Sequence, residues 1–406
     1  MTVITNIAEI VTASGNRPLS GSDQGKLEII EGKSIVIENG IIKEITGKRN
    51  FPGENIIDAE GGTVIPGLID SHTHVVYSGT REDEFYLRIK KVSYEDLLKS
   101  GNGIYNTIRN VTKANKDTIF AESIRRVKDA VSTGTTTMEI KTGYGLTLEN
   151  EEKLLSVISM IGNESFIDAV PTHLLHVVPE GYSEKDYVKY SENMINKFRN
   201  RINFVDIFCD SGAFSPESAA EIARYAEKIN IKMRMHANEI ANTGCIKSCR
   251  NVKIFSADHL IHTDDEDLEI LKEAGSIAAF LPATVFTLGE DFPDMRKFIE
   301  KGIPVVIASD ASPLNYSTNL LFSIYLAVTH SGISVEEAIV AVTLNAAYSL
   351  GCSETKGTIE AGKIADFAII DLDDYRKIPY EYGKPTVSKT VKNGKVVFDK
   401  NKSYEM

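Results

Sequence analysis

Cysteine is scarce in this chain, which has 406 residues but only Cys209, Cys245, Cys249 and Cys352. The four are scattered along the sequence and form no C-x-x-C pair. This pattern excludes a disulfide-rich miniprotein and disfavours a structural zinc site built from cysteines. We therefore expect reduced thiols in a cytosolic protein.

Long apolar runs and positive charge are also lacking. No stretch approaches the roughly 18 apolar residues of a membrane span, and Met1–Ile10 lacks the pattern of a signal peptide. We expect a cytoplasmic protein without membrane contact. Lys and Arg number 45 against 57 Asp and Glu, giving a net charge of −12. That balance disfavours nucleic acid as the main partner but permits a small anionic substrate.

Both ends of the chain have the pattern of β-hairpins. Apolar residues alternate over Ser34–Thr46 around Asn39-Gly40, and over Val387–Phe398 around Asn393-Gly394. Asn-Gly accepts positive φ at both central turn positions, which makes it a strong hairpin signal. We expect residues 1–63 and 355–406 to form one composite β-sandwich domain.

The middle of the chain alternates short apolar runs with amphipathic stretches such as Pro216–Lys228 and Asp265–Glu273. Eight such β-then-α units predict an α/β fold, a (β/α)₈ TIM-like barrel over residues 64–354. The eight runs are Val64–Asp70, Thr135–Ile140, Phe166–Pro171, Phe204–Cys209, Lys232–His236, Ile254–His259, Ser276–Pro282 and Pro304–Asp310.

Chemically active side chains gather where these runs end. In a barrel those ends converge on one face, where catalysis takes place. The residues are His72, His74, Glu139, Lys141, Tyr144, His173, His176, Asp210, His236, Glu239, Asp258, His259 and Asp310.

Four of these residues suggest a metal site. His72 and His74 are two apart, so on a strand both can face the barrel axis. With His236 and Asp310 they predict a site for one divalent metal per subunit, either zinc or iron, with an open position for water. Glu239, about one turn after His236, is placed to move the proton of an activated water.

The roles of three further residues stay open at this point. His259 is expected to polarise a substrate carbonyl, with Asp258 as a substitute that should point the other way along the strand. Arg81 either clamps a substrate carboxylate or pairs with Glu82 or Glu84.

Lys141 presents a separate choice. Some metal-dependent barrels use a carboxylated lysine to bridge two metals. Lys141 follows the second strand, whereas a bridging lysine is expected nearer the middle strands, so we favour a single-metal site.

The sequence resembles the amidohydrolase superfamily. The resemblance covers most of the chain and lies in Val64–His74, in His236, His259 and Asp310, and in the closing Lys356–Phe367 segment. Within that superfamily, four stretches are similar to the imidazolonepropionase family. They are Ser78–Arg88, Glu139–Leu146, His176–Pro179 and Val205–Cys209, of which Glu139–Leu146 is the most specific.

This resemblance implies hydrolysis of 4-imidazolone-5-propanoate to N-formimino-L-glutamate in histidine degradation. His72, His74, His236 and Asp310 match the metal ligands of the family. Glu239 and His259 match the pair that activates water and stabilises the transition state. Arg81, Tyr144 and His176 match substrate-binding positions.

One loop departs from the family pattern. After the aspartate ligand the family usually has Asp-x-Asn-Pro-Gly, whereas here Ser312 and Leu314 occupy the Asn and Gly positions. Either this loop contacts the substrate with different atoms or the substrate differs. Asn315 offers one replacement contact.

Two other functions fit parts of the pattern. A deaminase of a nucleobase-like ring would use the same ligands, although a carboxylate clamp has no purpose there. A barrel that has lost catalysis and serves in assembly would normally lose ligands, and none is missing here. For a soluble enzyme of this size we expect a homodimer.

Overall fold

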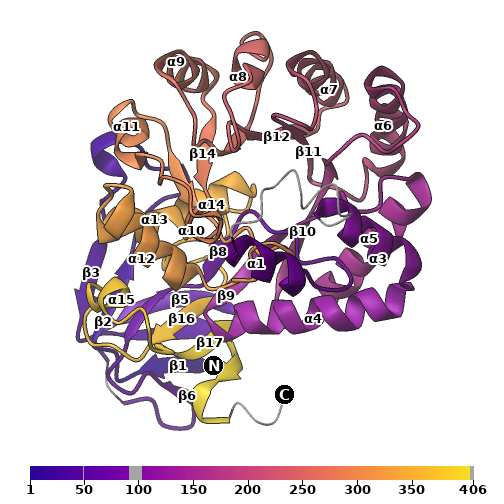
Figure 1. The fold of residues 1–406 in the computed structure, drawn as a ribbon. Helices are drawn as coiled ribbons and strands as arrows, with labels where there is room; N and C mark the ends of the chain where they lie inside the picture. The colour runs from indigo at the N-terminus through magenta and orange to yellow at the C-terminus, as the bar shows by residue number, and fades with distance from the viewer. Residues whose placement is uncertain (49, 91–102, 403–406) are drawn as a thin grey trace.

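The computed structural model describes residues 1–48, 50–90 and 103–402, and its centre is an eight-stranded parallel sheet (Figure 1). Residues 49, 91–102 and 403–406, which fall within the expected domains, lie outside the described part. In spatial and chain order the strands are β8 (Leu68–Asp70), β9 (Thr135–Lys141), β10 (Asp168–Leu175), β11 (Phe204–Cys209), β12 (Lys232–Ala237), β13 (Ser256–His259), β14 (Ile277–Phe280) and β15 (Val305–Ile307).

The sheet closes just beyond its first and last strands. Thr73 and Ala311 form a parallel bridge, and the His74 N–H donates to the Ala311 carbonyl at 2.8 Å. Asp70 accepts from the Ser309 N–H at 3.0 Å and from its hydroxyl at 2.5 Å, which ties the same two segments together. The predicted α/β barrel is confirmed.

Helices surround the barrel and carry its connections (Figure 1). Their bounds are α1 (Glu82–Ile89), α3 (Ile104–Lys113), α4 (Lys116–Ser132), α5 (Leu148–Gly162), α6 (Glu184–Phe198), α7 (Pro216–Lys228), α8 (Cys245–Ser248), α9 (Asp265–Ala274), α10 (Pro282–Leu288), α11 (Met295–Glu300), α12 (Leu320–His330), α13 (Val335–Ala341), α14 (Leu344–Ser349) and α15 (Lys377–Tyr380). The predicted helices at α7 and α9 are confirmed, and Ser215 and Asp264 cap their N-termini. Within the described residues, no helix has both the length and the apolar character needed to cross a membrane.

Two further sheets lie below the barrel in Figure 1, one from the N-terminal end alone and one from both chain ends. One has the order β5 (Ile41–Thr46), β4 (Ser34–Glu38), β1 (Thr2–Thr5), β6 (Asn55–Asp58). The other has the order β18 (Lys395–Asp399), β17 (Val387–Lys392), β16 (Phe367–Ile370), β7 (Thr63–Pro66), β2 (Glu9–Thr12), β3 (Glu28–Glu31). β16, from the C-terminal end, pairs with β7, so the two ends share one sheet.

The two predicted hairpins form at the Asn-Gly pairs. Asn39 and Gly40 have φ values of 53° and 79°, and Asn393 and Gly394 have 50° and 73°. These are the left-handed conformations that such turns require. The first predicted barrel run, by contrast, is two strands, because Thr63–Pro66 joins the terminal sheet and only Leu68–Asp70 joins the barrel.

Cys209 and Cys245 form a disulfide, so the expectation of four reduced thiols is wrong. The two residues are 36 apart in sequence, but the end of β11 and the start of α8 bring their Cα atoms to 6.0 Å. That separation suits a disulfide, and only the fold reveals it. Cys249 and Cys352 are free.

We expect reduction of this disulfide to lower the free energy of unfolding by about 2–4 kcal/mol, because it cross-links a long loop in the unfolded chain. Denaturant unfolding with and without reductant measures the difference. Alkylation of unreduced, denatured protein should label Cys249 and Cys352 alone. Labelling of all four cysteines would contradict the disulfide.

Candidate active site

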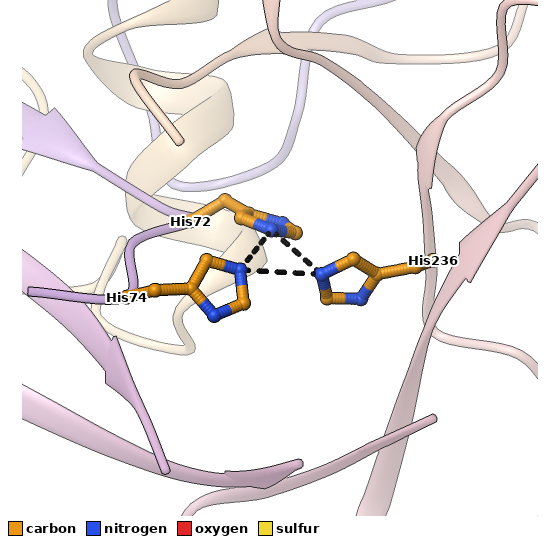
Figure 2. Close-up of side chains that lie close together, drawn as sticks. All are labelled: His72, His74 and His236. Carbon is orange, nitrogen blue, oxygen red and sulfur yellow. Dashed lines mark hydrogen bonds between the residues drawn. The ribbon is translucent and has the colours of Figure 1, made fainter. Parts of the chain in front are cut away.

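Three histidines direct their Nε2 atoms at one point inside the barrel mouth (Figure 2). His72 and His74 follow β8, and His236 lies near the end of β12. The Nε2 atoms are 3.2 Å apart between His72 and His74, 3.1 Å between His72 and His236, and 3.3 Å between His74 and His236. All three side chains are buried. They form a group that could hold a metal ion.

The spacing of these nitrogens fits a small cation. Nitrogens about 2.0–2.1 Å from a tetrahedral zinc are roughly 3.3–3.4 Å from one another. Asp310 Oδ1 extends the group, at 3.4 Å from His74 Nε2 and 3.7 Å from His72 Nε2. Its other oxygen accepts a 2.6 Å hydrogen bond from the Thr284 hydroxyl, which fixes the carboxylate. The four residues expected to bind metal therefore lie around one point.

Carboxylates behind two of the histidines hold their rings in place. His72 Nδ1 lies 2.7 Å from Asp258 Oδ2, and His236 Nδ1 lies 3.1 Å from Asp206 Oδ2. A proton on Nδ1 leaves the Nε2 lone pair free for a metal. Burial, together with neighbouring positive charge, lowers the pKa of His72 and of His74, which keeps both rings neutral. For His236 burial opposes protonation, but Asp206 outweighs it and raises the pKa.

Fully buried charged side chains lie next to the three histidine rings. Lys141 Nζ donates to Glu139 at 2.9 Å and to Asp206 at 2.7 Å. Arg234 donates to Asp258 at 3.1 Å. Together with Asp310, four carboxylates face two basic groups. Lys141 and Arg234 thus neutralise part of the buried negative charge around the histidines.

The ion pairs of Lys141 bear on the choice between one metal and two. Its amine is fully buried and donates to two carboxylates. An amine that carries a proton to satisfy both carboxylates is not a carboxylated lysine. The contacts of Lys141 thus support the single-metal alternative.

Glu239 and His259 lie together beside the histidines. His259 Nε2 is 3.6 Å from Glu239 Oε2, and the His259 ring centroid is 5.1 Å from that of His236. Neither ring nitrogen of buried His259 has a hydrogen-bond partner in the described chain. Burial, reinforced by the charge of Asp310, raises the pKa of Glu239 to about 8. Such a carboxyl group can both take up and release a proton near neutral pH.

The backbone turns sharply where His259 leaves its strand. Its φ is 78° and that of Leu260 is 61°, left-handed values that are strained for these residue types. This turn explains why Asp258 and His259, adjacent in sequence, both face the site. Strand alternation predicted that Asp258 points away from the site. This expectation is wrong, because the regular strand ends at His259 and the alternation ends with it.

The expected substrate-binding side chains line one side of the site. The Tyr144 ring lies 5.1 Å from that of His176 and 6.1 Å from that of His74, measured between centroids. Burial lowers the pKa of His176 to about 3, so this ring is neutral. Arg81 forms a two-pronged ion pair with Glu84, at 2.7 Å and 2.5 Å. Its charge still opposes the burial that raises the pKa of Tyr144.

Two features near the site have structural explanations. His173 turns outward, where its Nδ1 contacts the Thr142 hydroxyl at 2.9 Å, so it does not join the other strand-end histidines.

Asn315 is buried and donates to the Ser309 carbonyl at 2.8 Å and to the Thr284 hydroxyl at 3.1 Å. In the divergent loop, Asn315 therefore supports the segment that holds Asp310.

Sequence reasoning did not single out Asp206 or Arg234. Both lie within strands and share a face with residues two positions away, Phe208 and His236 respectively. Applied to charged residues inside strands, the same alternation that paired His72 with His74 would have found them. A charge in an apolar strand was the available signal.

A closed α/β barrel with three converging histidines, a carboxylate and a nearby Glu–His pair defines a metal-dependent barrel hydrolase. The sequence pattern of the amidohydrolase family matches residues 63–397. An imidazolonepropionase of Thermoplasma volcanium is 50% identical over 403 residues, covering 99% of this chain and 100% of the relative. One of Picrophilus torridus is 42% identical over 398 residues, covering 98% of each chain. The chain belongs to the amidohydrolase family and, within it, to the imidazolonepropionases.

Two solved structures with the same fold are more distant in sequence. A guanine deaminase of C. acetobutylicum has a TM-score of 0.73 at 19% identity, covering 98% of this chain and 100% of that one. A zinc-bound adenosine deaminase of Xanthomonas campestris has a TM-score of 0.75 at 14% identity, covering 100% and 94%. At these identities the likeness concerns the fold alone.

Proposed function

We propose that this hydrolase acts on a C–N bond of a small cyclic amide, opening 4-imidazolone-5-propanoate to N-formimino-L-glutamate in histidine degradation. The observation that carries the proposal is the convergence of His72, His74, His236 and Asp310 beside Glu239, in a chain 50% and 42% identical to two proteins named imidazolonepropionase. A deaminase is the weaker alternative, since the two deaminases of similar fold named above are only 19% and 14% identical to this chain.

His72, His74, His236 and Asp310 would hold one divalent metal per subunit, zinc or iron. A metal of this class supplies an activated water at neutral pH and polarises a carbonyl oxygen. The buried carboxylates Asp258 and Asp206 keep two of the ligand rings oriented.

Glu239 takes the proton that water loses as it adds to the ring carbonyl carbon. When the ring C–N bond breaks, Glu239 returns a proton to the departing nitrogen. His259, with both ring nitrogens unpartnered among the described residues, donates to the developing oxyanion. All atoms of the substrate stay in one product, so no ammonia is released.

Arg81, Tyr144 and His176 are the proposed substrate contacts. The propanoate carboxylate would bind the Arg81 guanidinium, whose ion pair with Glu84 holds it in a fixed orientation. Neutral His176 and the Tyr144 hydroxyl would bind the polar edge of the ring.

Arg81→Ala should raise KM at least tenfold while kcat changes little, because the guanidinium binds substrate and transition state alike. Steady-state kinetics with the purified variant measure both constants. Lys90→Ala serves as control and should leave KM unchanged. It removes an exposed cation just after α1, the helix that Arg81 directly precedes. An unchanged KM in Arg81→Ala would reduce Arg81 to an ion-pair partner of Glu84.

The function is tested by mixing the protein with 4-imidazolone-5-propanoate, following the loss of its ultraviolet absorbance and assaying ammonia in parallel. Decay without ammonia supports the proposed ring opening. Release of ammonia from this or a nucleobase substrate would favour the deaminase. No decay by metal-loaded protein would exclude this substrate.

Further parts of the proposal concern the whole protein. We propose that the protein is a homodimer and that it is cytoplasmic. We also propose that it binds its small-molecule substrate and neither nucleic acid nor a membrane. We also propose that residues 1–63 with 355–406, and residues 64–354, act as its two domains. Mass measurement in solution tests the dimer.

A further inference from the structure

Asp210, directly after β11, accepts backbone hydrogen bonds from the segment that carries Glu239. Its Oδ2 accepts from the backbone N–H groups of Glu239 at 2.7 Å and Ile240 at 3.0 Å. Its Oδ1 accepts from the N–H of Ala241 at 3.0 Å and from that of Ser211 at 2.7 Å. One buried carboxylate thus receives four backbone N–H donors, three of them from consecutive residues of another strand's loop. Charge-assisted bonds of this kind are the strong ones.

The Glu239 side chain has little else to hold it. Its carboxylate is 3.6 Å from His259 Nε2, beyond hydrogen-bond distance, and the described chain offers it no hydrogen bond. The backbone of the segment begins with Asn238 at a φ of 56°, a left-handed conformation. The place of the Glu239 carboxyl group is therefore set by its backbone, and that backbone is set by Asp210.

We propose that Asp210 is a positioning residue that holds Glu239 in register with the water and the leaving nitrogen. This inference rests on the proton-transfer role of Glu239 in the proposed function. Asp210 does not touch the reacting atoms in this scheme. It acts through Glu239 alone.

The test is a double-mutant cycle between Asp210→Asn and Glu239→Gln, measured as kcat at saturating substrate with metal content checked. Whichever way the new amide is turned, two N–H donors lose their acceptor. Asp210→Asn alone should lower kcat about 10–100-fold, since a misplacement near 1 Å costs about that much, with KM within about twofold. In the Glu239→Gln background it should cost nothing further. An unchanged kcat, or an equal loss in both backgrounds, would overturn the proposal.

Glu151 provides a matched control. It is an equally buried carboxylate that accepts from the N–H groups of Gly143, Gly145 and Leu146 at 3.1, 2.7 and 2.8 Å, and so holds the loop of Tyr144. Glu151→Gln should destabilise the fold to a similar degree, raise KM, and have the same effect with or without Glu239→Gln. If both variants behaved alike in the cycle, Asp210 would be merely structural.

A second readout does not depend on turnover. In Asp210→Asn, amide hydrogen exchange should be at least tenfold faster at Glu239 and Ile240 or at Ala241, according to which pair of donors loses its acceptor, with the Gly143–Leu146 amides unchanged. Unchanged exchange at Glu239, Ile240 and Ala241 would overturn the proposal that Asp210 positions Glu239, whatever the substrate is. If wild-type protein failed to open the ring while exchange changed as expected, that result would count against the proposed function and not against this role of Asp210.

Discussion

His236→Ala is expected to lose most of its metal and at least about 10³-fold in kcat/KM. The substitution removes one of three imidazoles whose Nε2 atoms lie 3.1–3.3 Å apart, and leaves the buried Asp206 carboxylate without that neighbour. A metal in such a site contributes several kcal/mol to transition-state stabilisation, and each 1.4 kcal/mol is about tenfold in rate. Metal analysis of dialysed protein and steady-state kinetics measure the two losses.

His330→Ala is the matched control for this variant, because it removes an exposed histidine that stacks on Phe292 and is not one of the site residues. It should keep both metal and activity. Circular dichroism of both variants checks that the barrel has folded. Full metal content and turnover in His236→Ala would remove the proposed site.

Glu239→Gln is expected to keep its metal while kcat falls by about 10²–10⁴-fold, the usual contribution of a positioned general acid–base. Glutamine has nearly the same shape but cannot carry the proton between water and the leaving nitrogen. Because Glu239 lies outside the group of His72, His74 and His236, the substitution leaves those metal-binding atoms in place. The combination of retained metal and lost turnover separates this role from that of a ligand.

The control for this variant is Glu273→Gln, which neutralises an exposed glutamate at the end of α9 and should behave as wild type. Single-turnover kinetics show whether the chemical step has slowed. Wild-type kcat in Glu239→Gln would mean that another group moves the proton.

Local rules predicted the elements that carry the site. The period of two predicted that His72 and His74 share one side, which they do although both follow β8, and Asn-Gly with positive φ formed both hairpins. The same rules failed at Asp258 and His259, because a left-handed turn at His259 breaks the alternation. They also could not tell that His173 turns outward while His176, three residues on, faces the site.

By itself, the sequence determined the barrel, the terminal sheets and the strand-end residues, since periodicity and turn chemistry act over a few neighbouring residues. Only the tertiary structure decided which of those side chains meet. The Cys209–Cys245 disulfide joins residues 36 apart in sequence, and the hydrogen bond from the Glu239 N–H to Asp210 joins residues 29 apart. Such contacts depend on how neighbouring strands and their loops lie in space, and no local pattern of residues encodes that distance.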